Sequence, residues 1–146
     1  MLGTLAKWLR ILGYDTVFEP GLDDHQLVRQ ARAEGRTILT CDRQLAERRG
    51  VCTLLVTAND LDDQVLQVLA DLHLEPERSY SRCPVCNTTL QEIDIEMART
   101  LVPAYVARTQ KQFKSCPGCQ RVYWRGTHWQ KMEKRLSRLG QNAQGS

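Results

Sequence analysis

The sequence has no apolar run that approaches the roughly 18 residues that a membrane-spanning helix needs. It also lacks a secretory signal peptide, because Met1 leads directly into an amphipathic stretch that contains Lys7 and Arg10. These absences predict a cytoplasmic protein without a membrane partner. Thiols stay reduced in that compartment, so the six cysteines are not expected to form three disulfides.

The chain also lacks low-complexity segments, a glycine-rich nucleotide-binding loop and, apart from two short cysteine turns, internal repeats. Its apolar and charged fractions, 42% and 25%, are ordinary for a globular protein. With 146 residues it can bury a sizeable core in one place, but hardly in two. One small domain joined to a mini-domain is therefore the expected organisation.

The net charge of +3 conceals two halves of opposite sign. Residues 1–77 carry 8 Lys and Arg against 13 Asp and Glu, whereas residues 78–146 carry 12 against 4. Carboxylates can hold cations, and a basic surface attracts phosphates by releasing their counterions. A solvated surface without any ligand would explain both halves equally well, so the charges alone leave both interpretations open.

The acidic half alternates helical and strand-like patterns. Helices are expected over residues 1–12, 23–35, 44–49 and 62–72, and strands over residues 16–18, 37–41 and 51–57. This alternation is typical of βαβ units, which form a parallel sheet with helices on both faces. Cys41 and Cys52 lie on the two later strands and are expected to be buried as small apolar side chains.

Acidic residues follow these strands, where parallel sheets usually form their binding sites. Carboxylates suit Mg²⁺ or Mn²⁺, which can activate a water molecule for phosphodiester hydrolysis. Each of these acids could instead cap a helix or begin a turn. The candidate catalytic residues are Asp24, Asp42 and Asp60, with Asp23, Asp62 and Asp63 behind them.

Two Cys-Pro-x-Cys turns, Cys83–Cys86 and Cys116–Cys119, stand in the basic half. Each turn places two thiolates close enough to share one ion, and the pair of turns gives zinc its four tetrahedral ligands. The four cysteines are therefore expected to hold a structural Zn²⁺ that is closed to water, with disulfides or free thiols as the alternatives. The 29 residues between the turns exceed the usual spacing of about 15–20, which predicts an inserted helix over residues 94–101 that breaks at Pro103.

Basic and aromatic residues interleave around the second turn. They are Lys111, Phe113, Lys114, Arg121, Tyr123, Trp124, Arg125, Trp129, Lys131, Lys134, Arg135 and Arg138. Basic groups neutralise phosphates and aromatic rings stack on unpaired bases, so this region is a candidate RNA-binding surface, although the rings could also form a local core. A helix is expected over residues 127–139, and a disordered tail over residues 140–146.

Several of these motifs occur together in one known family. They are Met1-Leu2-Gly3 with Trp8-Leu9-Arg10, Ile38-Leu39-Thr40 with Asp42-Arg43, Ser81-Arg82-Cys83 with Cys86-Asn87, and the run from Cys116 to Trp129. From Met1 to about Met132 the chain resembles the mut-seven C-terminal RNase domain, a PIN-like nuclease fold fused to a zinc ribbon.

The resemblance implies an α/β fold with a PIN-like three-layer parallel sheet, and a metal-dependent endoribonuclease that acts on single-stranded RNA. By matched position it implies Asp24 and Asp42, and more weakly Asp60, as ligands of Mg²⁺ or Mn²⁺, and Arg43 as a phosphate contact. Members of the family usually carry a strand before the Met-Leu-Gly helix, and that strand ends in the first metal-binding aspartate. We expect this first strand to be missing from the sheet.

The expected domains are a PIN-like nuclease domain over residues 1–77, a zinc-ribbon module over residues 78–139, and the tail. On the ribbon, Lys114, Arg121 and Arg125 are expected to bind the substrate together with Arg43. Two alternatives remain open. The chain could be a catalytically weakened or inactive RNA-binding zinc-ribbon protein, or an adaptor whose basic helix docks onto an acidic partner.

Overall fold

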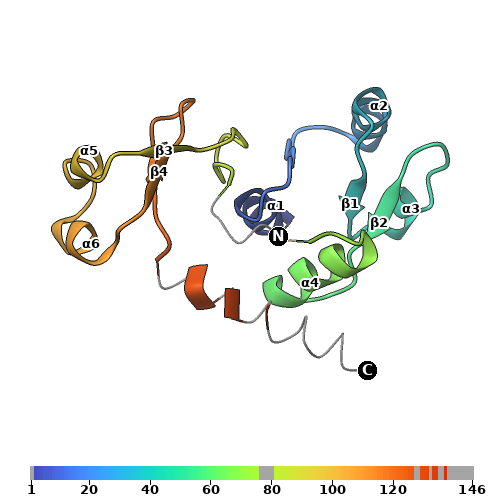
Figure 1. Cartoon of the computed structure of the whole chain (residues 1–146). Coiled ribbons are helices and arrows are strands. Elements are labelled where there is room, and N and C mark those ends of the chain that lie inside the picture. Colours follow the sequence, from blue (N-terminus) through green and yellow to red (C-terminus); the bar gives the residue numbers. More distant parts are fainter. Residues whose placement is uncertain (1, 76–80, 127–128, 132, 135–136, 138–146) are drawn as a thin grey trace. The chain divides into compact units, whose positions relative to one another are not determined.

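The computed structural model describes residues 2–75, 81–126, 129–131, 133–134 and 137 (Figure 1). The chain divides into two compact units. The first unit comprises Met1–Leu5 and Val17–Glu75, and the second comprises Ala6–Thr16 and Pro76–Ser146. The segment Ala6–Thr16 is thus grouped with the cysteine-rich part of the chain, while the expected domain boundary after residue 77 stays a prediction.

The first unit contains a two-stranded parallel sheet. Strand β1 (Ile38–Thr40) pairs with β2 (Thr53–Leu55), so that Ile38 lies opposite Thr53 and Thr40 lies opposite Leu55. Helix α2 (Asp24–Glu34) precedes the sheet, α3 (Arg43–Ala46) connects its strands, and α4 (Leu61–Asp71) follows it. The mixed α/β class is therefore confirmed, whereas the PIN-like three-layer arrangement stays a prediction.

Helix α2 begins where the sequence predicts, whereas the helix expected over residues 44–49 is the shorter α3, Arg43–Ala46. Asp23 and Gln26 form a reciprocal capping box at the start of α2, and Gly35 ends that helix in the left-handed conformation, with φ 67°. The helix buries Val28 and Ala31 against the sheet and α3. The core cluster consists of Val28, Ala31, Ile38 and Leu45, with Leu27 and Val51 at its margin.

The expected strand over residues 16–18 is wrong, because these residues adopt no regular secondary structure. The backbone N–H and carbonyl of Thr16, which could pair with a neighbouring strand, form hydrogen bonds with side chains instead. Its N–H donates to Asn87 Oδ1 (3.1 Å), and its carbonyl accepts from Arg10 Nε (2.7 Å). Phe18 stays 45% exposed rather than entering a core. A triplet of residues that favour strands was therefore not sufficient to form a strand here.

Helix α1 (Leu2–Ile11) confirms the helix expected at the start of the chain. Its apolar positions recur every three or four residues, and Leu5, Leu9 and Leu12 are buried. Gly13 follows the helix with φ 106°, a conformation that disfavours any residue with a Cβ.

The second unit is built on an antiparallel sheet of three short strands, in the order β3 (Gln91–Ile93), β4 (Phe113–Ser115) and β5 (Val122–Tyr123). Two helices, α5 (Ile95–Arg99) and α6 (Ala104–Thr109), stand between β3 and β4 in the chain and pack against each other (Figure 1). The expected inserted helix and its break at Pro103 are thus confirmed, because Pro103 occupies the N-cap position of α6. The core of the helical insert is Ala98, Val106 and Phe113, with Ile93, Ile95, Val102, Val122 and Trp124 packed around it.

The helix expected over residues 127–139 falls partly outside the described residues, as does the whole tail over residues 140–146. Residues 129–131, 133–134 and 137 are helical. Trp129 is buried and stacks on Trp8, with ring centroids 6.1 Å apart and planes 9° apart. None of the described helices combines the length and the hydropathy of a membrane span.

Candidate metal centre and acidic strand ends

The two cysteine turns fold in the same way. In each turn the second cysteine donates its backbone N–H to the sulfur of the first, over 3.4 Å for Cys86 to Cys83 and 3.4 Å for Cys119 to Cys116. Such N–H donors stabilise a thiolate, because they place positive partial charge beside the sulfur. The same hydrogen bond in both turns holds the two sulfurs of each turn on one side of that turn.

The residue after each turn adopts the left-handed conformation, with φ 63° at Asn87 and φ 62° at Gln120. Its backbone N–H donates a hydrogen bond to the carbonyl of the first cysteine, over 2.8 Å for Asn87 to Cys83 and 2.7 Å for Gln120 to Cys116. This closes each turn before the chain re-enters an extended segment.

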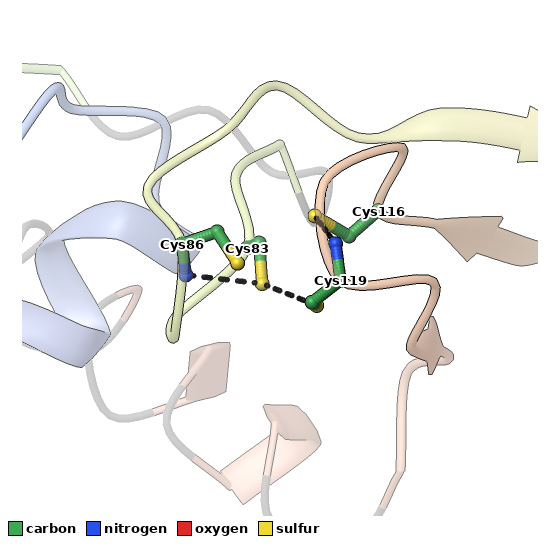
Figure 2. Close-up of side chains that lie close together, drawn as sticks. All are labelled: Cys83, Cys86, Cys116 and Cys119. Carbon is green, nitrogen blue, oxygen red and sulfur yellow. Dashed lines mark hydrogen bonds between the residues drawn. The ribbon is translucent and has the colours of Figure 1, made fainter.

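The turns bring all four sulfurs together, within 4.8 Å of one another (Figure 2). The sulfurs of Cys83 and Cys119 are 3.7 Å apart. Four sulfurs placed tetrahedrally at about 2.3 Å from one zinc ion would be separated by about 3.8 Å, so this spacing fits zinc. Cys83 and Cys116 are 0% and 1% exposed. The predicted metal-binding cluster of four cysteines is therefore confirmed in its geometry.

The thiols also influence each other's ionisation. A backbone hydrogen bond from Arg121 is the main cause that lowers the pKa of Cys119 to about 6, whereas the hydrogen bond with Cys119 raises the pKa of Cys86 to about 12. Four thiolates this close together would repel one another, so a cation is needed to offset their charge. A divalent ion coordinated by all four would supply that charge and leave no position for water.

Tyr123 supports the cluster from β5. Its hydroxyl lies 3.0 Å from the Cys83 sulfur, and its ring packs on the buried cysteines and Leu90. Hydrogen bonds to ligand atoms orient them and tune the metal, so the Tyr123 hydroxyl would hold the Cys83 sulfur in place for a bound zinc ion.

Sequence reasoning did not foresee that the segment Ala6–Thr16 binds the first cysteine turn. Arg10 Nη1 donates to the carbonyl of Pro84 over 2.6 Å. Asn87 donates from Nδ2 to Asp15 over 2.6 Å and accepts the Thr16 N–H, as described above. The available signal was that Arg10 and Asn87 both belong to the motifs that carry the family resemblance.

Two of the candidate catalytic acids cap helices at the carboxyl-terminal edge of the parallel sheet. Asp42 follows β1, donates its N–H to Thr40 Oγ1 (3.0 Å) and accepts the Gln44 N–H on Oδ1 (2.8 Å). Asp60 follows β2 and accepts the Asp63 N–H on Oδ1, also over 2.8 Å. One oxygen of each carboxylate therefore stabilises a helix, as the capping alternative predicted.

The three candidate acids do not form one cluster. Asp24 is the first residue of α2, and its neighbour Asp23 is the cap. Within the described residues, the four cysteines are the one group of three or more side chains close enough to share a metal ion. Asp24, Asp42 and Asp60 are therefore too far apart to form such a group. The Asp60 carboxylate, through a hydrogen bond and charge repulsion, raises the pKa of Asp63.

The candidate phosphate-binding residues lie at the surface of both units. Arg43 is the exposed first residue of α3. Lys114 is half-buried on β4, opposite Glu92 and Tyr123 in the neighbouring strands. Arg121 is exposed just before β5, and Arg125 is half-buried just after it.

The expected burial of Cys41 and Cys52 is wrong, because both cysteines are exposed. The strands are shorter than their apolar runs. Cys41 lies beyond the end of β1, and Cys52 precedes β2.

Together these features define a class of protein: a mixed α/β chain with a four-cysteine metal-binding centre. The sequence model of the Mut7-C RNAse domain matches residues 1–136. The chain therefore belongs to the Mut7-C RNAse domain family, which confirms the resemblance. No curated protein and no solved structure matches it.

Proposed function

We propose that the chain is a metal-dependent endoribonuclease that cuts single-stranded RNA in the cytoplasm. The observation that carries this proposal is the match of an RNase domain family to residues 1–136, nearly the whole chain. The separation of an acidic half from a basic half supports it, since cleavage of a polyanion needs both a cation site and a phosphate-binding surface.

Asp42 is the leading candidate for binding the catalytic ion, with Asp24 and Asp60 as further ligands. Mg²⁺ usually keeps several waters and binds one or two carboxylates together with substrate phosphates, so a preformed trio of acids is not required. A bound Mg²⁺ or Mn²⁺ would activate water and stabilise the leaving oxygen. The Gln44 N–H orients the Asp42 carboxylate, and the Thr40 hydroxyl accepts the Asp42 backbone N–H at the strand end.

The zinc ribbon would hold the RNA rather than cut it. The four cysteines fix the fold around the metal, and Lys114, Arg121 and Arg125 stand on or beside the strands of its sheet. Arg43 would contribute a phosphate contact next to Asp42 in the chain. Arginine suits this role because its planar guanidinium can donate two parallel hydrogen bonds to a phosphate.

The test is cleavage of an end-labelled single-stranded RNA in Mn²⁺ by the zinc-loaded chain, its Asp42→Asn variant and its Asp71→Asn variant. Asp71 is an exposed acid at the end of α4 and serves as the matched control. Loss of an ion that stabilises several kcal/mol of developing charge slows cleavage about a hundredfold or more. We expect that loss for Asp42→Asn and unchanged cleavage for Asp71→Asn. Equal rates for both variants would refute the assignment.

The second candidate function is RNA binding without cleavage. It is favoured by one observation, the dispersal of Asp24, Asp42 and Asp60 rather than their convergence on one ion. Under this alternative the chain binds the labelled RNA, Mn²⁺ brings about no cleavage, and Asp42→Asn leaves binding unchanged.

A further inference from the structure

The first unit contains a cavity with an unusual lining. Its volume is about 290 Å³. It is lined by His25, Val28, Arg29, Arg32, Arg48 and Arg49, none of which is acidic. A water molecule occupies about 30 Å³ in the liquid, so the cavity has room for a phosphate group with several waters.

One face of α2 provides most of this lining. His25, Arg29 and Arg32 recur at helical spacing, which places their side chains on the same side. His25 Nε2 lies 3.3 Å from Arg29 Nη2, so a neutral imidazole can orient that guanidinium. The opposite wall comes from the loop between α3 and β2, which carries Arg48 and Arg49.

Arg32 joins these two walls. It donates from Nε to the Gly50 carbonyl (2.8 Å) and from Nη2 to the Arg49 carbonyl (3.2 Å). Gly50 has φ 80°, and a Cβ there would collide with the Arg32 guanidinium. The loop is thus held against α2 by a contact that requires glycine, and its arginines are placed before any ligand arrives.

No carboxylate of the described residues pairs with the arginines of this cavity. None of its four arginines forms an ion pair with the described residues. The ion pair of Arg36 with Glu34 lies outside the cavity lining. Four of the 8 basic residues of the acidic half line this cavity, and none of the 13 acidic residues of that half does. Like charges held together repel, and an anion between them would offset that repulsion.

We infer that this cavity is a phosphate-binding site for single-stranded RNA, formed by Arg29, Arg48 and Arg49 around the structural Arg32. Guanidinium groups bind phosphate through paired, charge-assisted hydrogen bonds, which lysines cannot match. The identity of the ligand as RNA rests on the proposed function, whereas the preference for phosphate rests on the cavity itself. The first unit would thereby hold the strand with its own cations, independently of the basic residues on the ribbon.

The test compares two double variants that remove the same charge. Arg29→Ala/Arg48→Ala removes two guanidinium groups from the cavity, and within the described residues neither side chain donates to a backbone carbonyl. Arg99→Ala/Arg108→Ala is the control, because both arginines lie in the last turns of the short helices α5 and α6 and do not line the cavity. Binding of a labelled single-stranded RNA is measured by fluorescence anisotropy across a salt series, without added Mg²⁺ or Mn²⁺, so that cleavage plays no part.

The cavity variant should bind RNA about tenfold or more weakly than the control variant. Its slope of log affinity against log salt should become shallower by about 0.7, because the cavity holds one phosphate and each single-strand phosphate contact contributes about 0.7. Arg29→Lys/Arg48→Lys keeps the charge without the paired donors and should lie between the wild type and the alanine variant. Circular dichroism and zinc content, unchanged in all variants, show that folding is intact.

The source of the phosphate is distinguished by using the same RNA with a 5′-phosphate or a 5′-hydroxyl. An equal loss for both indicates a backbone phosphodiester, and a loss confined to the phosphorylated RNA indicates a terminal phosphate. Equal binding by the cavity and control variants would overturn the inference and leave the nuclease proposal standing. No binding of RNA by the wild type would overturn both, and weakened binding by the cavity variant without any cleavage in Mn²⁺ would support the site while refuting the nuclease.

Discussion

Replacing Asn87 should destabilise the second unit through contacts that lie outside the metal centre. Its side chain accepts the Thr16 N–H (3.1 Å) and donates to the Asp15 carboxylate (2.6 Å). A neutral hydrogen bond contributes about 0.5–1.5 kcal/mol and one to a charged group about 1.5–3 kcal/mol. Both lie near the surface, so the lower ends apply, and we expect Asn87→Gly to cost about 2 kcal/mol.

Glycine is chosen because Asn87 has φ 63°, a conformation that glycine adopts without strain. Asn87→Ala should cost more, about 3 kcal/mol, since the left-handed conformation adds roughly 1–2 kcal/mol for a residue with a Cβ. Gln120→Gly is the matched control. Gln120 holds the equivalent place after the second cysteine turn, with φ 62°, and its side chain makes no hydrogen bond within the described residues.

The assay is urea unfolding followed by tryptophan fluorescence at one fixed, saturating zinc concentration, because bound zinc adds to the measured stability. Asn87→Gly should lose about 2 kcal/mol in free energy of unfolding, and Gln120→Gly should change it by less than about 1 kcal/mol. If both glycine variants lose the same free energy, the hydrogen bonds of Asn87 to the N-terminal segment contribute nothing.

Three further outcomes follow from the structure. Cys116→Ser should release zinc and unfold the second unit, because structural zinc contributes on the order of 10 kcal/mol; native mass spectrometry that still finds one zinc per chain would contradict this. Gly50→Ala should lower the free energy of unfolding by about 2 kcal/mol or more through its positive φ and its collision with Arg32, while Gly21→Ala, which meets no atom, should stay within about 0.5 kcal/mol in the same urea assay. Asp60→Asn should lower the pKa of Asp63 toward its ordinary value, since the Asp60 carboxylate is what raises it; an unchanged pKa in a carboxyl-carbon NMR titration would refute that cause.

Local signals explain why most elements could be predicted from the sequence. Asp23 begins α2 with a side-chain cap, and Gly35 ends it in the left-handed backbone conformation; both features are typical of helix ends. The spacing within each cysteine turn sufficed to predict the metal cluster, because a four-residue turn determines where its two sulfurs lie. Pro103 likewise marked a break between helices, since proline lacks the N–H that an uninterrupted helix would need.

The features that could not be predicted depend on contacts between distant residues. The triplet over residues 16–18 has the composition of a strand, but Arg10 and Asn87 bind the backbone of Thr16 instead. Nothing in the local sequence of Cys41 indicates that β1 ends one residue earlier. The arginine cavity was missed for a related reason, because Arg29 and Arg48 are 19 positions apart and become neighbours only when the loop folds against α2.

Electron paramagnetic resonance of Mn²⁺ directly measures whether the aspartates at the strand ends hold a divalent ion. The zinc-loaded chain is titrated with Mn²⁺ in the presence of a single-stranded oligonucleotide, and the titration is repeated with Asp42→Asn and Asp71→Asn. A metal-dependent nuclease with Asp42 as a ligand should bind one Mn²⁺ per chain, about tenfold or more weakly in Asp42→Asn and unchanged in Asp71→Asn. Identical Mn²⁺ binding by all three proteins, or none by the wild type, would contradict the assignment of the catalytic ion to this part of the chain.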